Sequence, residues 1–287
     1  TAPEALPPLT VATLARFLKN PVKEFFRQRL DVVLREEDSA DDDDEVLSLA
    51  GLPQYQLLSG ALAAVLASTP AGASSAQDLP GQLAAQVAAQ TTHTRRSGLL
   101  PMAELGRRAE AALAQTLQPM LTCWAELQAL YPTPLPKEPL RLALAGVTVD
   151  DWLSGVQATG AQRVMLDMQP SKLTSGTRAP SVVVDKLVTA WVRMLVTSAC
   201  GLPVVGVVVG RDARVTMQPL PKAEAETQLA TLLQTWTQGM TEPLPLPCKT
   251  GLAWVAGASD VQTVYEGSPQ RSGEVQDACL ARQYPDF

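Results

Sequence analysis

The sequence predicts an α/β fold in which a mixed β-sheet is flanked by helices on both faces and preceded by a mostly helical part. Apolar residues recur at helical spacing up to about residue 130, whereas alternating and β-branched runs follow from Leu140 onward. Helical spacing also returns between those runs, which is typical of a sheet covered by helices. Hydrophobic residues make up 46% of the 287 positions and aromatic residues only 5%, so we expect an aliphatic core.

Two short helices open the N-terminal part, which we place at residues 1–136. Thr10 is a suitable N-cap for the first helix. Pro21 ends that helix and begins the second, because a first helical turn does not need the N–H that proline lacks. Longer helices are expected over residues 53–68 and from 101 to about 130. The apolar face of the second helix should comprise Val22, Phe25, Phe26 and Leu30.

Two polar stretches interrupt these helices. An acidic loop, residues 36–45, holds clustered aspartates, but it lacks the alternating spacing and central glycine of a calcium-binding EF-hand loop. Small residues over 68–81 predict a flexible linker. The only histidine, His93, lies in a polar stretch without an acidic or cysteine neighbour. We therefore expect it to be exposed rather than a metal ligand or a general base.

The C-terminal part, residues 137–287, should contain the sheet. Its run "VVGVVVG" is almost continuously β-branched, which predicts a strand covered on both faces. The expected order is strand 140–149, strand 160–168, helix 181–200, strand 204–210, strand 213–220 and helix 222–240. We expect both parts to form one structural domain cut from a longer chain, since the sequence begins at Thr1 and stops abruptly.

Charge and cysteine usage narrow the class of protein. Lysine and arginine total 23 against 29 acidic residues, which gives a formal charge of −6. An acidic surface does not attract phosphate, so the chain is not expected to bind double-stranded DNA by itself. This argument does not apply if the chain belongs to a larger assembly whose basic surface lies elsewhere. The four cysteines show no zinc-site spacing, and we expect reduced thiols in a cytosolic protein. No apolar run approaches the roughly 18 residues that a membrane span needs.

Five stretches, taken together, resemble one protein family. They are "RFLKNPVKEFFRQRLDVVLREED", "SGLLPMAELG", "TQGMTEPLPLP", "GLAWV" and "VYEG". In order and spacing they are similar to the C-terminal domain of the exodeoxyribonuclease V gamma subunit, which is the RecC chain of the RecBCD helicase–nuclease. The similarity runs from about Leu9 to Pro285. It implies a PD-(D/E)xK nuclease-like fold.

The resemblance also implies the positions of a degenerate nuclease site. Active relatives combine a helix histidine, a strand aspartate and an Asp-x-Lys strand, because Mg²⁺ needs converging carboxylates and the lysine stabilises charge in the transition state. The corresponding positions here are Ser59, Ser154, Asp167 and Gln169, the last two in "RVMLDMQPSKL". One acid of the set survives. The resemblance therefore implies no catalysis, no metal and no cofactor.

A working Mg²⁺-dependent nuclease with an atypical site around Asp167 is the alternative. Asp150 or Asp151 could supply a second carboxylate, but neighbouring strand side chains point to opposite faces, so at most one could join Asp167. We expect these two acids to be a turn or strand-end pair. Lys172 could replace the lost lysine only if the strand continued past Pro170.

The resemblance implies a scaffold role in place of chemistry. The partners would be the RecB and RecD subunits, RecD above all, together with double-stranded DNA ends and unwound single strands. The setting would be repair of double-strand breaks by homologous recombination in the bacterial cytoplasm. A protein-interaction domain unrelated to DNA follows only if the resemblance is accidental.

Candidate DNA contacts are few. Trp152 and Trp254 could stack on bases, but we expect both in the core. Helix-end charge explains the arginine pairs as well as phosphate contact does. The two pairs are Arg95 with Arg96, and Arg107 with Arg108.

Overall fold

The computed structural model describes residues 8–34, 51–68, 103–176, 180–269 and 271–287, with single positions at 85, 88, 89, 92 and 96. The acidic loop expected over 36–45, all but the first residue of the linker expected over 68–81, and His93 and Arg95 lie outside the described residues.

Two helices form at the N-terminal end, α1 (Val11–Lys19) and α2 (Pro21–Arg29). Thr10 caps α1, as predicted, because its Oγ1 accepts a hydrogen bond from the Thr13 backbone N–H at 3.1 Å. Asn20 caps α2 in the same way, accepting from the Lys23 N–H at 2.9 Å. The expectation for Leu30 was wrong: α2 ends one residue before it, and its side chain is exposed.

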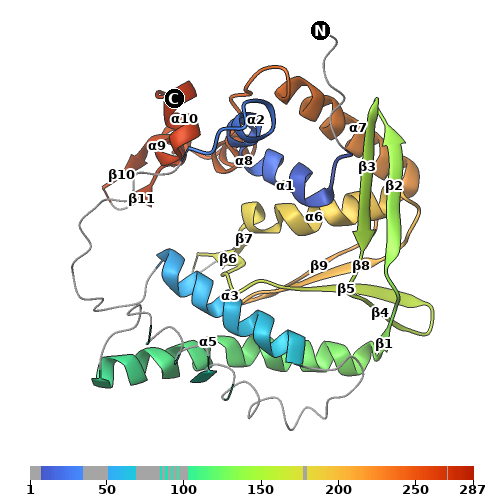
Figure 1. The fold of residues 1–287 in the computed structure, drawn as a ribbon, viewed down its shortest axis with the longest axis vertical. Coiled ribbons are helices and arrows are strands. Elements are labelled where there is room, and N and C mark those ends of the chain that lie inside the picture. Colours follow the sequence, from blue (N-terminus) through green and yellow to red (C-terminus); the bar gives the residue numbers. More distant parts are fainter. Residues whose placement is uncertain are drawn as a thin grey trace.

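A five-stranded mixed sheet lies at the centre of the molecule (Figure 1), in the order β1-β4-β5-β8-β9. β5 and β8 pair in parallel, while the other neighbours are antiparallel. A parallel pair needs a long crossover, and the helix α6 (Val184–Ala199) supplies it. The strands are β1 (Thr133–Pro134), β4 (Val156–Thr159), β5 (Gln162–Met168), β8 (Val205–Val209) and β9 (Arg214–Met217).

Helices cover both faces of this sheet, as predicted. α3 (Gly51–Ser68) and α5 (Ala103–Leu130) lie on one face, and α6 lies on the other (Figure 1). On the first face, leucines of α3 and α5 pack against Val207 and Val209. On the second, Val208 packs against Leu187 and Ala190 of α6. β8 is therefore buried on both faces, which explains its β-branched sequence.

A second layer lies beyond α6. There α1 and α7 (Lys222–Gly239) pack against α6, in a core that includes Phe17, Val192 and Trp236. The rings of Phe17 and Trp236 meet edge to face with centroids 5.1 Å apart. Gly239 permits this approach, because a Cβ there would lie 2.4 Å from the Phe17 ring. The two largest cores each join helices of the N-terminal part to the sheet or to α6.

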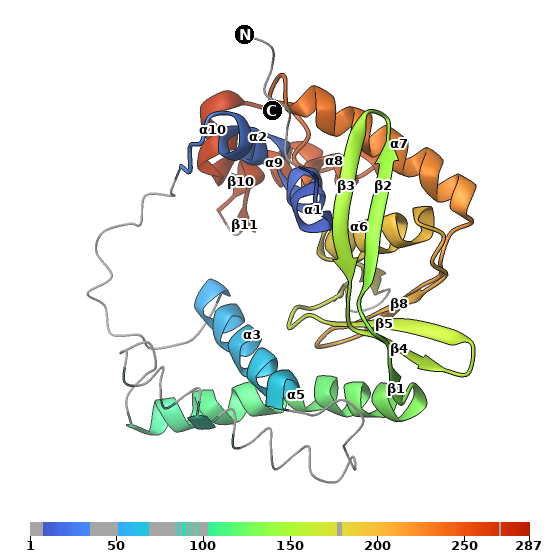
Figure 2. The ribbon, with the colours of Figure 1, turned by 45° about the vertical axis from the view of Figure 1, so that its right-hand side comes forward.

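The single strand expected over residues 140–149 was wrong. Two strands occupy the region, β2 (Glu138–Leu144) and β3 (Val147–Leu153), and they form a separate antiparallel hairpin that stands beside α7 (Figure 2). The chain reverses at Ala145 and Gly146, which both have positive φ, 50° and 77°. Such a two-residue turn matches the twist of a hairpin. The hairpin packs Leu140, Val149 and Leu153 into the core of the second layer.

The C-terminal end forms a cluster of short helices around α2. The C-terminal elements are α8 (Cys248–Val255), α9 (Val261–Glu266), β10 (Gly267–Ser268), β11 (Arg271–Ser272), a 3₁₀ turn (Glu274–Gln276) and α10 (Ala278–Gln283). Two further short strands, β6 (Thr174–Ser175) and β7 (Ser181–Val182), pair with each other before α6. Among the described residues, no helix is both long enough and apolar enough to cross a bilayer.

Candidate functional site

Asp167, the surviving acid of the predicted site, is the second-last residue of β5 and pairs with Val208 of β8. Side chains alternate along a strand, so Asp167 shares a face with Met165, which packs in the core on the α6 side. Gln169 follows on the same face just beyond the strand end. Asp167 is half-buried, and no described residue makes a hydrogen bond or an ion pair with its side chain. The strand therefore brings Asp167 and Gln169 to one edge of the sheet, beneath the start of α6.

The loop after β5 is held against the turn between β8 and β9. The Gln169 N–H donates to the Val209 carbonyl at 3.0 Å, and the Arg211 N–H donates to the Ser171 carbonyl at 3.0 Å. Gly210 makes this contact possible, since a Cβ there would lie 2.9 Å from the Ser171 carbonyl oxygen. β5 ends at Met168, before Pro170, as predicted. The loop is a fixed platform at the end of the parallel strands, where α/β sheets commonly bind ligands.

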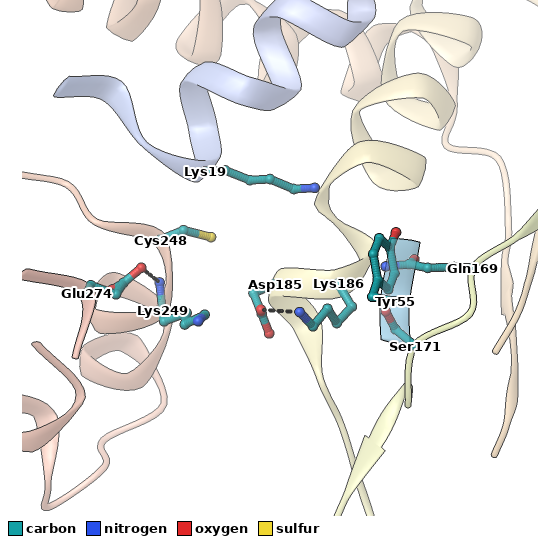
Figure 3. A pocket seen from close by; sticks show the side chains of 9 residues that line it. All are labelled: Lys19, Tyr55, Gln169, Ser171, Asp185, Lys186, Cys248, Lys249 and Glu274. Carbon is teal, nitrogen blue, oxygen red and sulfur yellow. Dashed lines mark hydrogen bonds and ion pairs between the residues drawn. The ribbon is translucent and has the colours of Figure 1, made fainter. Parts of the chain in front are cut away.

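A cavity of about 530 Å³ opens next to this loop (Figure 3). Its wall is built from six separate parts of the chain: the end of α1, α3, the loop after β5, the start of α6, the start of α8 and the 3₁₀ turn. Three lysines line it, Lys19, Lys186 and Lys249, together with Tyr55 and Gln169. The remaining lining residues are Ser171, Asp185, Cys248 and Glu274.

A second cavity, of about 360 Å³, shares Tyr55, Ser171 and Lys186 with the first. It adds Lys172 and Arg211 to the lining. The Nε of Arg211 is buried and finds no acceptor among the described residues. We call the two cavities together the cation cleft, defined by its five cationic residues Lys19, Lys172, Lys186, Lys249 and Arg211.

The two acids of the cation cleft are already engaged. Glu274 accepts from the backbone N–H groups of Lys249 (3.0 Å) and Thr250 (2.7 Å), and also from the Thr250 hydroxyl, so it caps the start of α8. Asp185 forms an ion pair with Lys186 at 3.9 Å (Figure 3). Burial, and then the charges of Glu274 and Asp185, raise the pKa of Cys248 to about 11. That thiol is neutral at neutral pH and is not an activated nucleophile.

The other two positions of the predicted site, Ser59 and Ser154, do not line the cation cleft. Ser59 lies on α3 one helical turn after Tyr55, and its Oγ is buried with no hydrogen-bond partner among the described residues. Ser154 is exposed and follows the end of β3. The pairing of β4 with β5 ends at Val156↔Met165. If it continued for two more residues, Ser154 would lie opposite Asp167.

Asp150 and Asp151 serve the hairpin and α1. Both lie inside β3, so the expectation of a turn or strand-end pair was wrong. Asp150 forms an ion pair with Arg141 at 3.2 Å, and Asp151 accepts from the Val11 N–H at 2.8 Å, which caps α1. Neither is therefore a spare carboxylate. Across the described residues, no three His, Cys, Asp or Glu side chains gather in a way that could hold a metal ion.

The expectation that Trp152 and Trp254 lie in the core was wrong. Trp152, on the outer face of β3, is 56% exposed, and Trp254, near the end of α8, is 70% exposed. Of the arginine candidates, Arg96 is exposed, and both Arg107 and Arg108 pair with Glu104 on the surface of α5. None of these described residues lines the cation cleft.

Sequence reasoning missed the residues of the cation cleft itself. Lys19, Tyr55, Lys186 and Lys249 come from four helices and meet only through the tertiary fold. Each one, viewed along the sequence, is an ordinary surface side chain near a helix end. The only signal available was the position of the loop after β5, which any α/β fold would mark as a binding edge.

The fold and the cation cleft define an α/β module with a cleft lined by cationic side chains next to the loop after β5. A model of the family "RecC C-terminal domain" matches residues 7–259, and the chain therefore belongs to the RecC C-terminal domain family. The chain is 28% identical over 263 residues to the RecBCD enzyme subunit RecC of Escherichia coli (strain K12). That alignment covers 91% of this chain and 20% of the relative, so the chain spans about a fifth of the length of that protein. The resemblance drawn from the five sequence stretches is confirmed.

Proposed function

We propose that this chain is a catalytically inactive, nuclease-like module of a RecC subunit, which holds partner subunits and guides separated DNA strands. The observation that carries the proposal is the isolation of Asp167. A metal-dependent nuclease usually brings more than one carboxylate together at its Mg²⁺ site, which waters and substrate phosphates complete. Here Gln169 stands two residues after the acid, and the nearest candidate acids in the sequence cap α1 or pair with Arg141.

The topology supports a PD-(D/E)xK-like arrangement. Helices precede an antiparallel set of strands, a crossover helix follows β5, and β8 returns parallel to it. Asp167 sits near the end of the strand that leads into the crossover. Because one fold hosts many activities, this order supports the fold assignment and not an activity.

The exposed apolar side chains support a scaffold role. Trp254 and Val255 at the end of α8 are 70% and 85% exposed, and Leu246 just before that helix is also exposed. Contiguous exposed apolar patches on a folded protein often mark contacts with other chains, and Trp254 and Val255 are consecutive residues. By its family membership the chain would meet such chains in the RecBCD enzyme, with RecB and RecD as the expected partners.

A cleavage assay tests the proposed inactivity. Labelled single- and double-stranded DNA, incubated with the 287-residue chain and Mg²⁺ or Mn²⁺, should remain intact, and Asp167→Ala should behave like the unchanged protein. Cleavage that disappears in Asp167→Ala would overturn the proposal and favour the atypical nuclease.

Reconstitution tests the scaffold. Co-purification of the chain with RecB and RecD should fail or weaken when Trp254 and Val255 are both changed to Glu, since two charges would be buried at the contact. Leu130→Glu, a similar change at an exposed apolar residue of α5, is the matched control and should leave the assembly intact. Equal assembly by all variants would contradict the docking role of α8.

A further inference from the structure

We infer that the cation cleft binds the phosphodiester backbone of a single nucleic-acid strand, with Tyr55 as a stacking surface for one base. The inference rests on the proposed strand-guiding function and adds to it a location and a set of contacts. Its basis is the convergence of Lys19, Lys172, Lys186, Lys249 and Arg211 from distant segments onto two neighbouring cavities.

The charge of the cation cleft contrasts with that of the chain. Five cations line it against two acids, Asp185 and Glu274, in a protein whose net charge is −6. Glu274 is bound to three donors at the start of α8, and Asp185 forms an ion pair with Lys186, so the cleft keeps an excess of positive charge. Cations gathered in a concave surface concentrate the positive potential and attract anions. The cleft is therefore suited to a polyanion rather than to a neutral ligand.

Two further features favour phosphate groups. The Arg211 Nε donor is buried without an acceptor among the described residues, and a guanidinium matches the geometry of phosphate oxygens. α6 begins at the cation cleft, with no side chain capping its first turn. The positive end of that helix adds to the field of the lysines, and Asp185 in its first turn offsets part of it.

Tyr55 gives the site a preference for single strands. It lines both cavities, is 41% exposed, and comes from α3 (Figure 3). Aromatic rings beside a cationic groove bind unstacked bases, which a duplex does not offer. The combination of cations and one accessible ring is thus the chemistry of a strand-guiding groove.

Fluorescence anisotropy with a labelled oligothymidylate, measured in EDTA across a salt series, tests the inference. The variant with Lys172, Lys186 and Lys249 all changed to Gln should bind at least tenfold more weakly. Its logarithmic salt slope should fall by about two, since each lost phosphate contact removes roughly 0.7 for a single strand. Tyr55→Ala should weaken single-strand binding by about fivefold or more and leave the salt slope unchanged.

The matched control changes Lys137, Lys222 and Arg282 to Gln, which removes the same three charges from exposed positions outside the cation cleft. It should change affinity less than threefold. Equal losses in both triple variants, equal binding of duplex, or equal binding of poly-glutamate would each overturn the assignment to a nucleic-acid strand.

The result is separable from the test of inactivity, because EDTA removes any metal-dependent cleavage. A chain that leaves DNA intact but binds it independently of the cleft lysines would refute only this inference. A chain that cleaves DNA but binds it through those lysines would refute only the proposed inactivity.

Discussion

At the scale of single residues, Asp212 holds the end of the loop after β5, which lines part of the cation cleft. Its carboxylate accepts from the Leu173 N–H at 2.7 Å and from both the N–H and the hydroxyl of Thr174. Burial alone would raise the pKa of Asp212, but these hydrogen bonds outweigh it and lower the pKa below its usual value. The ionised form therefore stabilises the folded loop.

Asp212→Asn should lower the melting temperature at neutral pH, and the difference from the unchanged protein should shrink in acid. The folded pKa lies below the unfolded one, so this stabilisation is fully present above the unfolded pKa of about 3.9 and is lost as pH falls through the folded pKa. Calorimetric melts between pH 7 and pH 3 measure the gap. Asp260→Asn, at an exposed acid without a capping bond, is the control. A gap that widens toward low pH would contradict the role of Asp212.

The neighbouring residues Asp150 and Asp151 should contribute differently to stability, because one forms a surface ion pair and the other caps a helix. Asp151→Ala should destabilise the fold by about 1 kcal/mol, because the Val11 N–H at the start of α1 loses its acceptor. Asp150→Ala should cost about 0.5 kcal/mol or less, since its ion pair with Arg141 is exposed. Urea unfolding of both variants measures the difference. The opposite ranking would show that Asp151 does not cap α1.

At the scale of elements, the hairpin of β2 and β3 depends on an unusual turn. Ala145 adopts φ of 50°, a left-handed conformation that costs an L-residue with a Cβ about 1 kcal/mol or more, whereas Gly146 adopts φ of 77° at little cost. The turn therefore stores strain at one position.

Ala145→Asn should stabilise the protein by about 0.5–1 kcal/mol, because asparagine followed by glycine is favoured in this turn. Gly146→Ala should destabilise it by a similar amount or more, since it introduces a second strained residue. Denaturant midpoints with unchanged slopes would measure both effects. A loss of stability in Ala145→Asn would mean that the turn is not of this type.

The elements that could be predicted from the sequence are those with a clear local signal. Thr10, Pro21 and the β-branched run of β8 each gave the right element, because caps, proline and β-branching act locally. The hairpin was missed because Ala-Gly is not a common turn pair and its alternation continues on both sides. The short helices α8 to α10 were missed because they are too short to show periodicity and owe their stability to packing.

At the scale of the whole molecule, the distribution of charge matters more than its sum. The run from Glu36 to Glu45 holds eight of the 29 acidic residues, and setting these eight negative charges aside turns the net charge of −6 into +2. An overall acidic balance is thus compatible with a cationic groove elsewhere on the chain. The cation cleft could not be predicted from the sequence, since its five cations meet only through the tertiary fold.

A metal site at Asp167 would also depend on the whole fold, because a second carboxylate would have to come from another element. The strand position of Asp167 and the loss of a cation at Gln169 are local and readable in the sequence. Whether a second carboxylate converges on Asp167 depends on the packing of distant elements. The structure accounts for Asp150 and Asp151 by the hairpin and α1.

The most direct test of the account is calorimetric titration of the 287-residue chain with Mg²⁺ and with Mn²⁺, beside the Asp167→Ala variant. A lone carboxylate competes poorly with water for these ions, so we expect no saturable binding below millimolar metal and no difference between the two proteins. Tight binding that disappears in Asp167→Ala would contradict the account and make the end of β5 a metal-dependent active site.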